Sequence, residues 1–116
     1  MSRETLKYLH DILAAADLIA RFVAQKQFAD YQCDAMLRSA VERQFEIIGE
    51  ALNQLGRRAP DLVREVRGYK RAIAFRNILI HGYADVDDEI VWRVIEDDLP
   101  LLQYDIGRLQ EHESTG

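Results

Sequence analysis

The sequence of 116 residues is poor in the features that mark several classes of protein. It has a single cysteine, Cys33, so an internal disulfide is excluded and a reducing compartment is favoured. We expect Cys33 to be a small buried or half-buried residue rather than a nucleophile. Asp17 interrupts the apolar stretch at residues 12–20, and no stretch approaches the roughly 18 apolar residues of a membrane span. Because residues 1–11 carry charges of both signs, a signal peptide is not indicated, and the sequence predicts a cytoplasmic protein with no membrane association.

The motifs of several enzyme classes are also missing. Serine occurs only at positions 2, 39 and 114, and there is no Gly-rich phosphate-binding loop, so neither a Ser/His/Asp site nor a nucleotide-binding loop is indicated. The acidic residues at 85–89 have no histidine or cysteine that completes a ligand set, and the capping of a helix N-terminus explains them better. We therefore expect no metal and no cofactor.

Apolar residues recur at helical spacing throughout, and no segment alternates as a strand would. The pattern predicts an all-α protein with one domain at residues 1–116, built as an antiparallel bundle of four main helices plus a short extra helix. The main helices are expected at about 3–27, 31–55, 69–81 and from 85–89 onward, with the short one at 60–66. Pro100 should kink or restart the last helix, and residues 110–116 should form a frayed polar tail.

Some single residues in this pattern carry further expectations. We expect a turn at residues 28–30, and we expect Gly56 and Gly82 to end their helices. Gly49 lies inside the second helix, where glycine costs about 1 kcal/mol relative to alanine, and it therefore indicates a close approach between helices. Glu46 and Glu50 share one face of that helix and are within reach of the basic segment, as structural ion pairs or as site residues. We favour structural pairing.

Charge is distributed unevenly along the chain, although the net charge is −5. Residues 57–76 hold seven basic and two acidic side chains, a local charge of +5, whereas residues 84–113 hold ten acidic and two basic ones, a local charge of −8. The basic segment is suited to holding a phosphate backbone, with Lys70 and Arg71 as candidate contacts. The alternative is a solvated basic helix face whose charge the acidic helices offset.

The most informative segment is Arg76-Asn77-Ile78-Leu79-Ile80-His81-Gly82-Tyr83, at the end of the helix predicted for residues 69–81. Arg76 is permanently charged and suits a non-bridging phosphate oxygen, while an imidazole such as that of His81 can take or give a proton near neutral pH. We therefore take Arg76 and His81 as candidate catalytic residues, with Asn77 in support. The alternatives are a capping or core histidine, an arginine paired with the acidic fourth helix, and a packed Tyr83.

The spacing of these residues constrains how a site can form. On a regular helix Asn77 and His81 lie within about 40° of each other, whereas Arg76 and His81 lie about 140° apart. One copy of the helix does not focus Arg76 and His81 on the same phosphate, but two copies related by a two-fold axis can. This geometry favours a composite site at the seam of a homodimer.

The octapeptide resembles the Arg-x4-His-x-Tyr signature of the HepT-like toxins, a branch of the HEPN superfamily. The segments at 41–51, 90–92 and 97–100 are similar to that family's second and last helices. The resemblance covers about residues 5–110 and implies a dimeric helical bundle with a metal-independent RNase site at its seam, formed by Arg76 and His81. It further implies an MntA-like minimal nucleotidyltransferase antitoxin, which transfers AMP from ATP to the motif tyrosine, here Tyr83.

Three functions compete at this point. The first is a ribonuclease toxin of a type VII-like toxin–antitoxin pair that cuts RNA, with tRNA as a candidate substrate, and is silenced by adenylylation of Tyr83. The second is a non-catalytic HEPN partner that supports substrate or nucleotide binding by a nucleotidyltransferase. The third is a plain dimeric interaction bundle with a decayed motif, which the intact Arg76, His81 and Tyr83 argue against.

Overall fold

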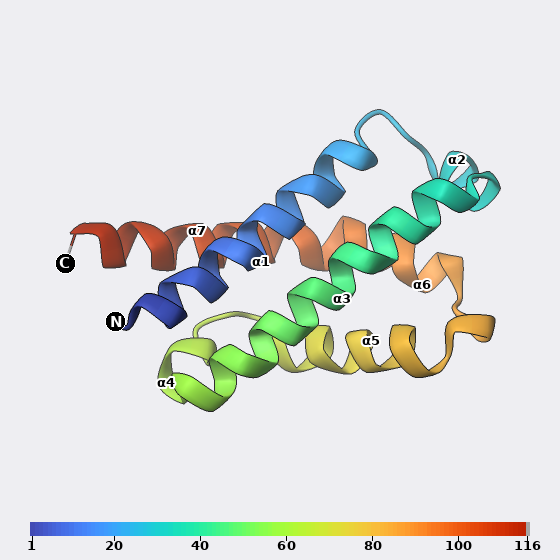
Figure 1. The fold of residues 1–116 in the computed structure, drawn as a ribbon. Helices are drawn as coiled ribbons and strands as arrows, with labels where there is room; N and C mark the ends of the chain where they lie inside the picture. Colours follow the sequence, from blue (N-terminus) through green and yellow to red (C-terminus); the bar gives the residue numbers. More distant parts are fainter. Residues whose placement is uncertain (116) are drawn as a thin grey trace.

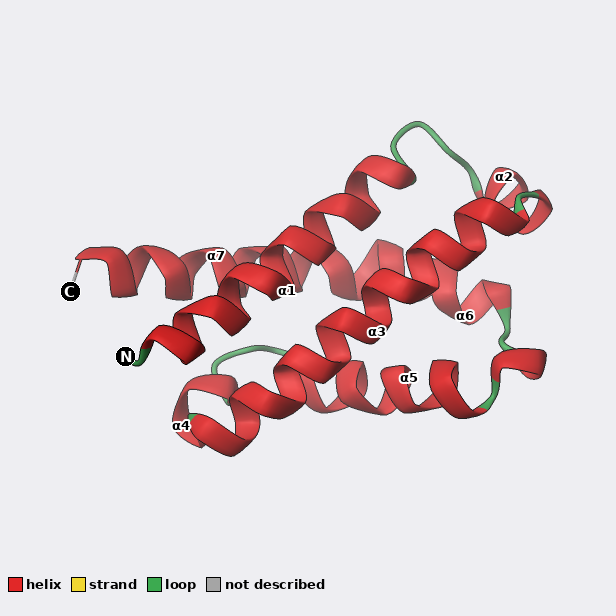
Figure 2. Cartoon of the chain, viewed as in Figure 1, coloured by secondary structure: helices red, strands yellow, loops and turns green. Residues whose placement is uncertain are grey.

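The computed structural model describes residues 1–115, and the side chains of residues 83 and 113–115 lie outside this description. Within that part the chain is all helix and turn, with no strand (Figure 2), which confirms the predicted fold class. The four long helices are α1 (Arg3–Phe22), α3 (Ala35–Arg58), α5 (Tyr69–His81) and α7 (Leu99–Thr115). Shorter elements join them: α2 (Phe28–Cys33), α4 (Pro60–Val63), a 3-10 turn (Tyr83–Asp85), α6 (Asp88–Arg93) and a π turn (Val94–Asp98).

The first helix is shorter than predicted. The Ser2 side chain caps its start by accepting a hydrogen bond from the backbone N–H of Thr5 at 3.1 Å. The helix ends at Phe22 and not near residue 27, because the chain turns at Gln25, whose φ is +62°. The buried residues of the helix are Thr5, Leu9, Ile12, Ala15, Ala16 and Ile19.

The expected turn at residues 28–30 is wrong, because these residues begin the short helix α2. Tyr31 of α2 is fully buried, with its ring centroid 5.6 Å from that of Trp92. Asp34 then caps α3, since its carboxylate accepts a hydrogen bond from the backbone N–H of Leu37 at 3.1 Å. Cys33 is exposed at the end of α2, so the expectation that it is buried or half-buried is also wrong.

The end of α3 is set by a proline and not by Gly56. The helix continues through Gly56 to Arg58 and stops at Ala59, which precedes Pro60. A residue before proline is disfavoured in helical geometry, because its backbone clashes with the proline ring. Pro60 then opens α4, as expected for proline in a first helical turn, but α4 ends at Val63, before the predicted residue 66.

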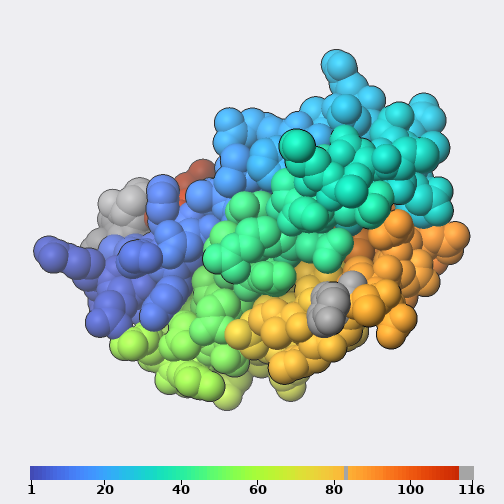
Figure 3. All heavy atoms as spheres, turned by 45° about the vertical axis from the view of Figure 1, so that its right-hand side comes forward, coloured from blue at the N-terminus to red at the C-terminus, as the bar shows by residue number. Residues whose placement is uncertain are grey.

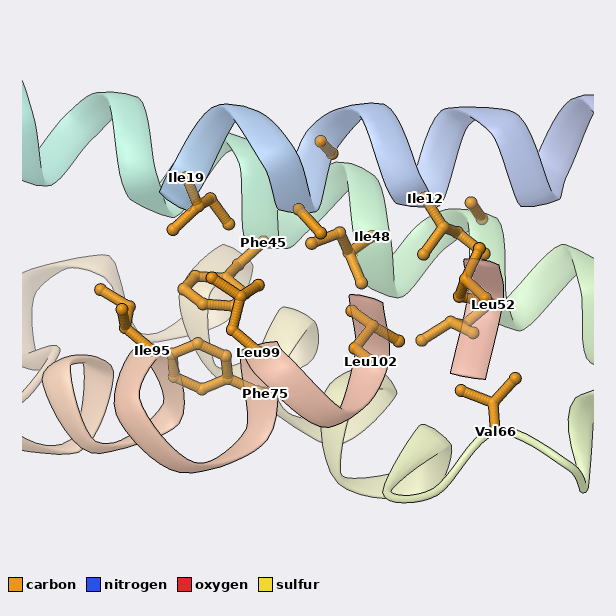
Figure 4. Packing of buried hydrophobic residues seen from close by; sticks show 14 of the residues in the cluster. Ile12, Ile19, Phe45, Ile48, Leu52, Val66, Phe75, Ile95, Leu99 and Leu102 are labelled. Carbon is orange, nitrogen blue, oxygen red and sulfur yellow. The ribbon is translucent and has the colours of Figure 1, made fainter. Parts of the chain in front are cut away.

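Consecutive long helices run in opposite directions, with α3 at the centre between α1 and α5 and with α7 against α1 (Figure 1). The core lies where α1, α3, α5 and α7 face one another (Figure 4). There the rings of Phe45 and Phe75 meet edge to face, with centroids 5.2 Å apart. Leu99 of α7 lies beside this aromatic pair and Leu102 lies farther along α7, so α3, α5 and α7 share one apolar interior.

The last helix restarts close to the predicted position. Pro100 lacks a backbone N–H, and the chain before it forms a π turn in which the N–H of Leu99 bonds to the carbonyl of Val94. The prediction of a break near Pro100 thus corresponds to this π turn between α6 and α7. The backbone of α7 continues as a helix to Thr115, past the frayed tail expected from residue 110.

Asp105 fixes the segment that leads into α5. It is 7% exposed, and its carboxylate accepts hydrogen bonds from the backbone N–H, Nε and a terminal nitrogen of Arg67, at 2.9, 3.1 and 2.9 Å. Burial by itself raises the pKa of Asp105, but the bonds from Arg67 outweigh it and lower that pKa. Gly68 follows Arg67 with a φ of +74° and precedes the first residue of α5.

We predict that Asp105→Asn lowers the free energy of unfolding by about 2 kcal/mol at pH 7, because it weakens charge-assisted hydrogen bonds. The lowered pKa sets the pH dependence: this stability is present above the unfolded-state pKa of about 3.9 and is lost as pH falls through the folded-state value. Denaturant unfolding from pH 7 down to pH 2 measures it. Asp98→Asn, which loses a longer, exposed bond to Arg71, is the control, and an equal loss in both variants at pH 7 would contradict the assignment.

Candidate functional site

Helix α5 carries the candidate residues and has the predicted bounds, Tyr69–His81. It ends at Gly82, whose N–H bonds to the carbonyl of Ile78 at 2.7 Å, so Gly82 is the terminator that the sequence indicated. Arg76, Asn77 and His81 therefore lie in the last two turns of the helix. The following residues leave the helix at once and form the 3-10 turn Tyr83–Asp85.

Arg76 is directed toward α3. One terminal nitrogen lies 2.8 Å from a carboxylate oxygen of Glu50, and the other donates to the side-chain carbonyl of Asn77 at 3.0 Å. The alternative that Arg76 pairs with the acidic fourth helix is therefore wrong, and the expected pairing with Glu50 is confirmed. Each terminal nitrogen of a guanidinium carries two N–H groups, so each has a second N–H besides the one that Glu50 or Asn77 engages.

Gly49 explains how α5 comes so close to α3 at this point. A Cβ placed on Gly49 would lie 2.2 Å from the Cβ of Arg76 and 3.1 Å from the backbone carbonyl of Ala72. No side chain fits there without moving α5, so the predicted close approach at Gly49 is confirmed. The same contact brings Glu50, the next residue, within bonding distance of Arg76.

Asn77 and His81 are exposed on the outer side of α5, one helical turn apart. The interpretation of His81 as a core histidine is therefore wrong. Asn77 supports Arg76 directly, by the hydrogen bond above, and among the described residues no hydrogen bond joins His81 to Arg76. Ile78 and Ile80 lie beside these polar residues and are 56% and 40% exposed. One chain therefore presents Arg76 and His81 in different directions, as the helical offset predicts.

A family model described as ribonuclease HepT-like matches residues 12–109. A probable ribonuclease HepT of Thermococcus cleftensis is 33% identical, over 96% of this chain and 100% of its own length. A candidate RNase of Methanocaldococcus jannaschii is 31% identical over 91% of this chain and 97% of its own, and one of Caldanaerobacter subterraneus is 30% identical over 91% and 94%. No solved structure gives a significant match.

The chain belongs to the HepT-like ribonuclease family. This is a family of endoribonucleases within the HEPN superfamily, which confirms the resemblance seen in the octapeptide. The match covers the whole of α3 and α5 and reaches residue 109 of α7, so the two helices that hold Arg76 and Glu50 lie within the family region. The role of Tyr83 stays a prediction, because its side chain lies outside the described residues.

The basic segment of this HepT-like chain is largely neutralised by its own carboxylates. Arg64 pairs with Asp61 at 2.8 Å, Arg67 with Asp105 at 2.9 Å and Arg71 with Asp98 at 3.4 Å. Lys70 lies among these arginines, is exposed, and has no ion pair with any described residue. The alternative of a basic face offset by acidic residues thus holds for the three arginines, and RNA contacts by Lys70 and Arg71 stay predictions.

Of the acidic residues at 85–89, Asp87 caps α6. The side chain of Asp87 accepts a hydrogen bond from the backbone N–H of Glu89 at 2.9 Å. Among the described residues, no group of three or more His, Cys, Asp or Glu side chains is placed to hold a metal ion. None of the helices of residues 1–115 is long and apolar enough to cross a membrane.

Sequence reasoning missed a groove beside Arg76. It has a volume of about 270 Å³ and is lined by α1, α3 and α5, which lie side by side on the face shown in Figure 3. The contribution of α1, from Tyr8 and Asp11, could not be anticipated, because no local signal links α1 to the Arg76 segment. The only sequence signal for the groove was the pair Glu46 and Glu50, one turn apart on α3.

We predict that Gly49→Ala lowers the free energy of unfolding by about 1–3 kcal/mol, because the added methyl group forces α5 away from α3. The matched control is Gly107→Ala in α7, where an added Cβ meets no atom within 4 Å and alanine should be neutral or stabilise by up to about 1 kcal/mol. Equilibrium unfolding of both variants in urea measures the difference. An equal gain in the two variants would refute the close contact.

Proposed function

We propose that this chain is a metal-independent endoribonuclease toxin of a type VII-like toxin–antitoxin pair, which cuts RNA with a composite site at a homodimer seam. The observation that carries the proposal is the intact Arg-x4-His-x-Tyr segment at the end of α5, with Arg76 held by Glu50 and Asn77. Relatives named as ribonucleases support the reaction class. We further propose tRNA as a candidate substrate.

In the proposed reaction the ribose 2′-hydroxyl of the RNA attacks the adjacent phosphorus, and the bond to the 5′-oxygen of the next nucleotide breaks. His81 removes the proton of the attacking hydroxyl, or donates one to the leaving oxygen. Arg76 binds a non-bridging oxygen and stabilises the extra negative charge of the pentacoordinate transition state. The products are a 2′,3′-cyclic phosphate and a 5′-hydroxyl, and no step needs a metal ion.

The divergence of Arg76 and His81 within one chain supports a site shared between two chains. Arg76 is turned toward α3, while His81 is exposed on the outer side of α5. A two-fold contact along the outer side of α5 would place His81 of one copy near Arg76 of the other. Ile78, which is 56% exposed, supplies apolar surface for such a contact.

Silencing is proposed to act on Tyr83. This residue follows the helix-terminating Gly82, directly beside the Arg76/His81 segment in sequence. An AMP group on Tyr83 would add an anionic phosphate close to Arg76 and His81, where it would occupy the RNA phosphate position and repel RNA. An MntA-like nucleotidyltransferase is the proposed source of the AMP.

The composite site predicts complementation between two inactive variants. Arg76→Ala and His81→Ala should each abolish cleavage. His81→Ala should leave the free energy of unfolding nearly unchanged, because His81 is exposed. Heterodimers formed by refolding the two variants together contain one site with both residues intact. The mixture should therefore recover about a quarter of the wild-type rate.

The control is refolding of each variant alone, which should recover nothing. The heterodimer can be verified by its mass. If the mixture then stays inactive, either both residues of each site come from one chain, or cleavage requires Arg76 and His81 of both chains. A solution mass of one chain at micromolar concentration would reject the dimer itself.

Modification of Tyr83 can be tested by co-expression. After co-expression with its nucleotidyltransferase partner, the chain should carry AMP on Tyr83 and should no longer cut RNA, whereas Tyr83→Phe should remain unmodified. Tandem mass spectrometry locates the adduct, and Tyr104, which is 60% exposed, is an internal control for simple accessibility. An adduct on Tyr104 or Tyr69, or a modified chain that cuts RNA at full rate, would contradict the proposal.

A further inference from the structure

The groove beside Arg76 has chemistry that the proposed cleavage does not use. Its lining includes the aliphatic side chains of Ile47, Ala51 and Ile80, and Tyr8 lines it from α1. Arg76 forms part of its wall. A phosphate held by Arg76 would therefore lie at the margin of the groove, and the nucleotide attached to that phosphate could extend along it.

The charges along the groove disfavour a second phosphate there. Three carboxylates line it, from Asp11, Glu46 and Glu50, against the guanidinium groups of Arg76 and Arg43, and the Arg43 side chain is 69% exposed. Carboxylates repel a phosphate but accept hydrogen bonds from neutral donors. The occupant that fits this lining is a neutral group with a flat apolar face and N–H donors on its edge, which describes a nucleobase.

Glu46 is the carboxylate most available to such a base. Asp11 is bonded to Lys7 at 2.8 Å, and Glu50 is bonded to Arg76 at 2.8 Å and to Gln54 at 3.1 Å. Glu46 meets only Arg43, at 3.5 Å, and its side chain is 26% exposed. A half-buried carboxylate whose single ion pair is long, and whose partner is exposed, gains the most from a new hydrogen-bond donor. Solvent screens the charge of a half-buried carboxylate less than that of an exposed one.

The donor pattern decides between the four bases. Guanine presents an N–H and an amino N–H side by side on its pairing edge, which match the two oxygens of a carboxylate. Adenine and cytosine present one amino group next to an acceptor, and uracil presents one N–H between two carbonyl oxygens that a carboxylate repels. The edge is free only in unpaired RNA, where bases are read by hydrogen bonds and packing.

We propose that the groove between α1, α3 and α5 binds one unpaired guanine base next to the phosphate that Arg76 holds, and that Glu46 reads its pairing edge. The proposal rests on the ribonuclease activity proposed above and specifies the substrate of the same site. It makes the enzyme selective for single-stranded RNA with guanine beside the cut.

The test begins with the wild-type chain and a single-stranded RNA of random sequence, whose cut positions should be enriched in guanine on one side. A matched set of oligonucleotides then carries guanine, inosine, adenine, cytosine or uracil at that position. Inosine lacks only the amino group of guanine, so guanine RNA should be cut about 10-fold or more faster than inosine or uracil RNA, the effect expected for a lost charge-assisted hydrogen bond.

Glu46→Gln keeps the size of the side chain but removes its charge. It should lower the rate on guanine RNA by about tenfold or more, lower the rate on inosine RNA by a smaller factor because inosine keeps the ring N–H, and change the rate on uracil RNA by less than about twofold. The matched control is Glu42→Gln, one turn earlier on α3 and outside the groove lining, which should leave all five rates unchanged. Equal rates on all five wild-type substrates, or an equal loss on all five in Glu46→Gln, would overturn the proposal.

The outcomes also separate this proposal from the proposed function. If the wild-type chain cuts none of the oligonucleotides, or if His81→Ala cuts as fast as wild type, the proposed ribonuclease site is rejected. Equilibrium binding of the same five oligonucleotides then decides on the groove. Tighter binding of guanine than of inosine RNA that is lost in Glu46→Gln supports the groove, and equal binding overturns it.

Discussion

The close contact of α3 and α5 at Gly49 is the constraint on which the candidate site depends. A side chain at position 49 would overlap the Cβ of Arg76, so the two helices can meet there only because residue 49 is glycine. The contact places Glu50 at 2.8 Å from the guanidinium, and Asn77 holds the other terminal nitrogen. An arginine that is ordered before RNA arrives loses less side-chain entropy on binding, and this preorganises it for a phosphate.

Ion pairing also reduces the number of unpaired cations on the basic segment. Three arginines at the start of α5 or just before it, Arg64, Arg67 and Arg71, are engaged by carboxylates of the chain itself. The local excess of positive charge in the sequence therefore overstates the charge that a phosphate backbone would meet. Lys70 has no ion pair with any described residue, and each terminal nitrogen of Arg76 carries a second N–H group besides the one that Glu50 or Asn77 engages.

The sequence predicts what local signals determine. Helix α5, its terminator Gly82, the close approach at Gly49 and the pairing of Glu50 follow from glycine chemistry and helical spacing, and the structure confirms them. Two features were missed because they depend on contacts with distant segments. Helix α2 forms because Tyr31 is buried against Trp92, and the groove beside Arg76 needs Tyr8 and Asp11 of α1. The end of α1 at Phe22 was missed because Gln25, unlike glycine, gives no sign of a positive φ.

The central claim is that Arg76 and His81 cut RNA through the ribose 2′-hydroxyl without a metal ion. Analysis of the RNA ends after cleavage by the purified chain in excess chelator tests this claim most directly. The account predicts an undiminished rate, with 2′,3′-cyclic phosphate and 5′-hydroxyl ends, and no such products from His81→Ala. Fragments that end in 3′-hydroxyl groups, or cleavage that stops when the chelator is added, would contradict it.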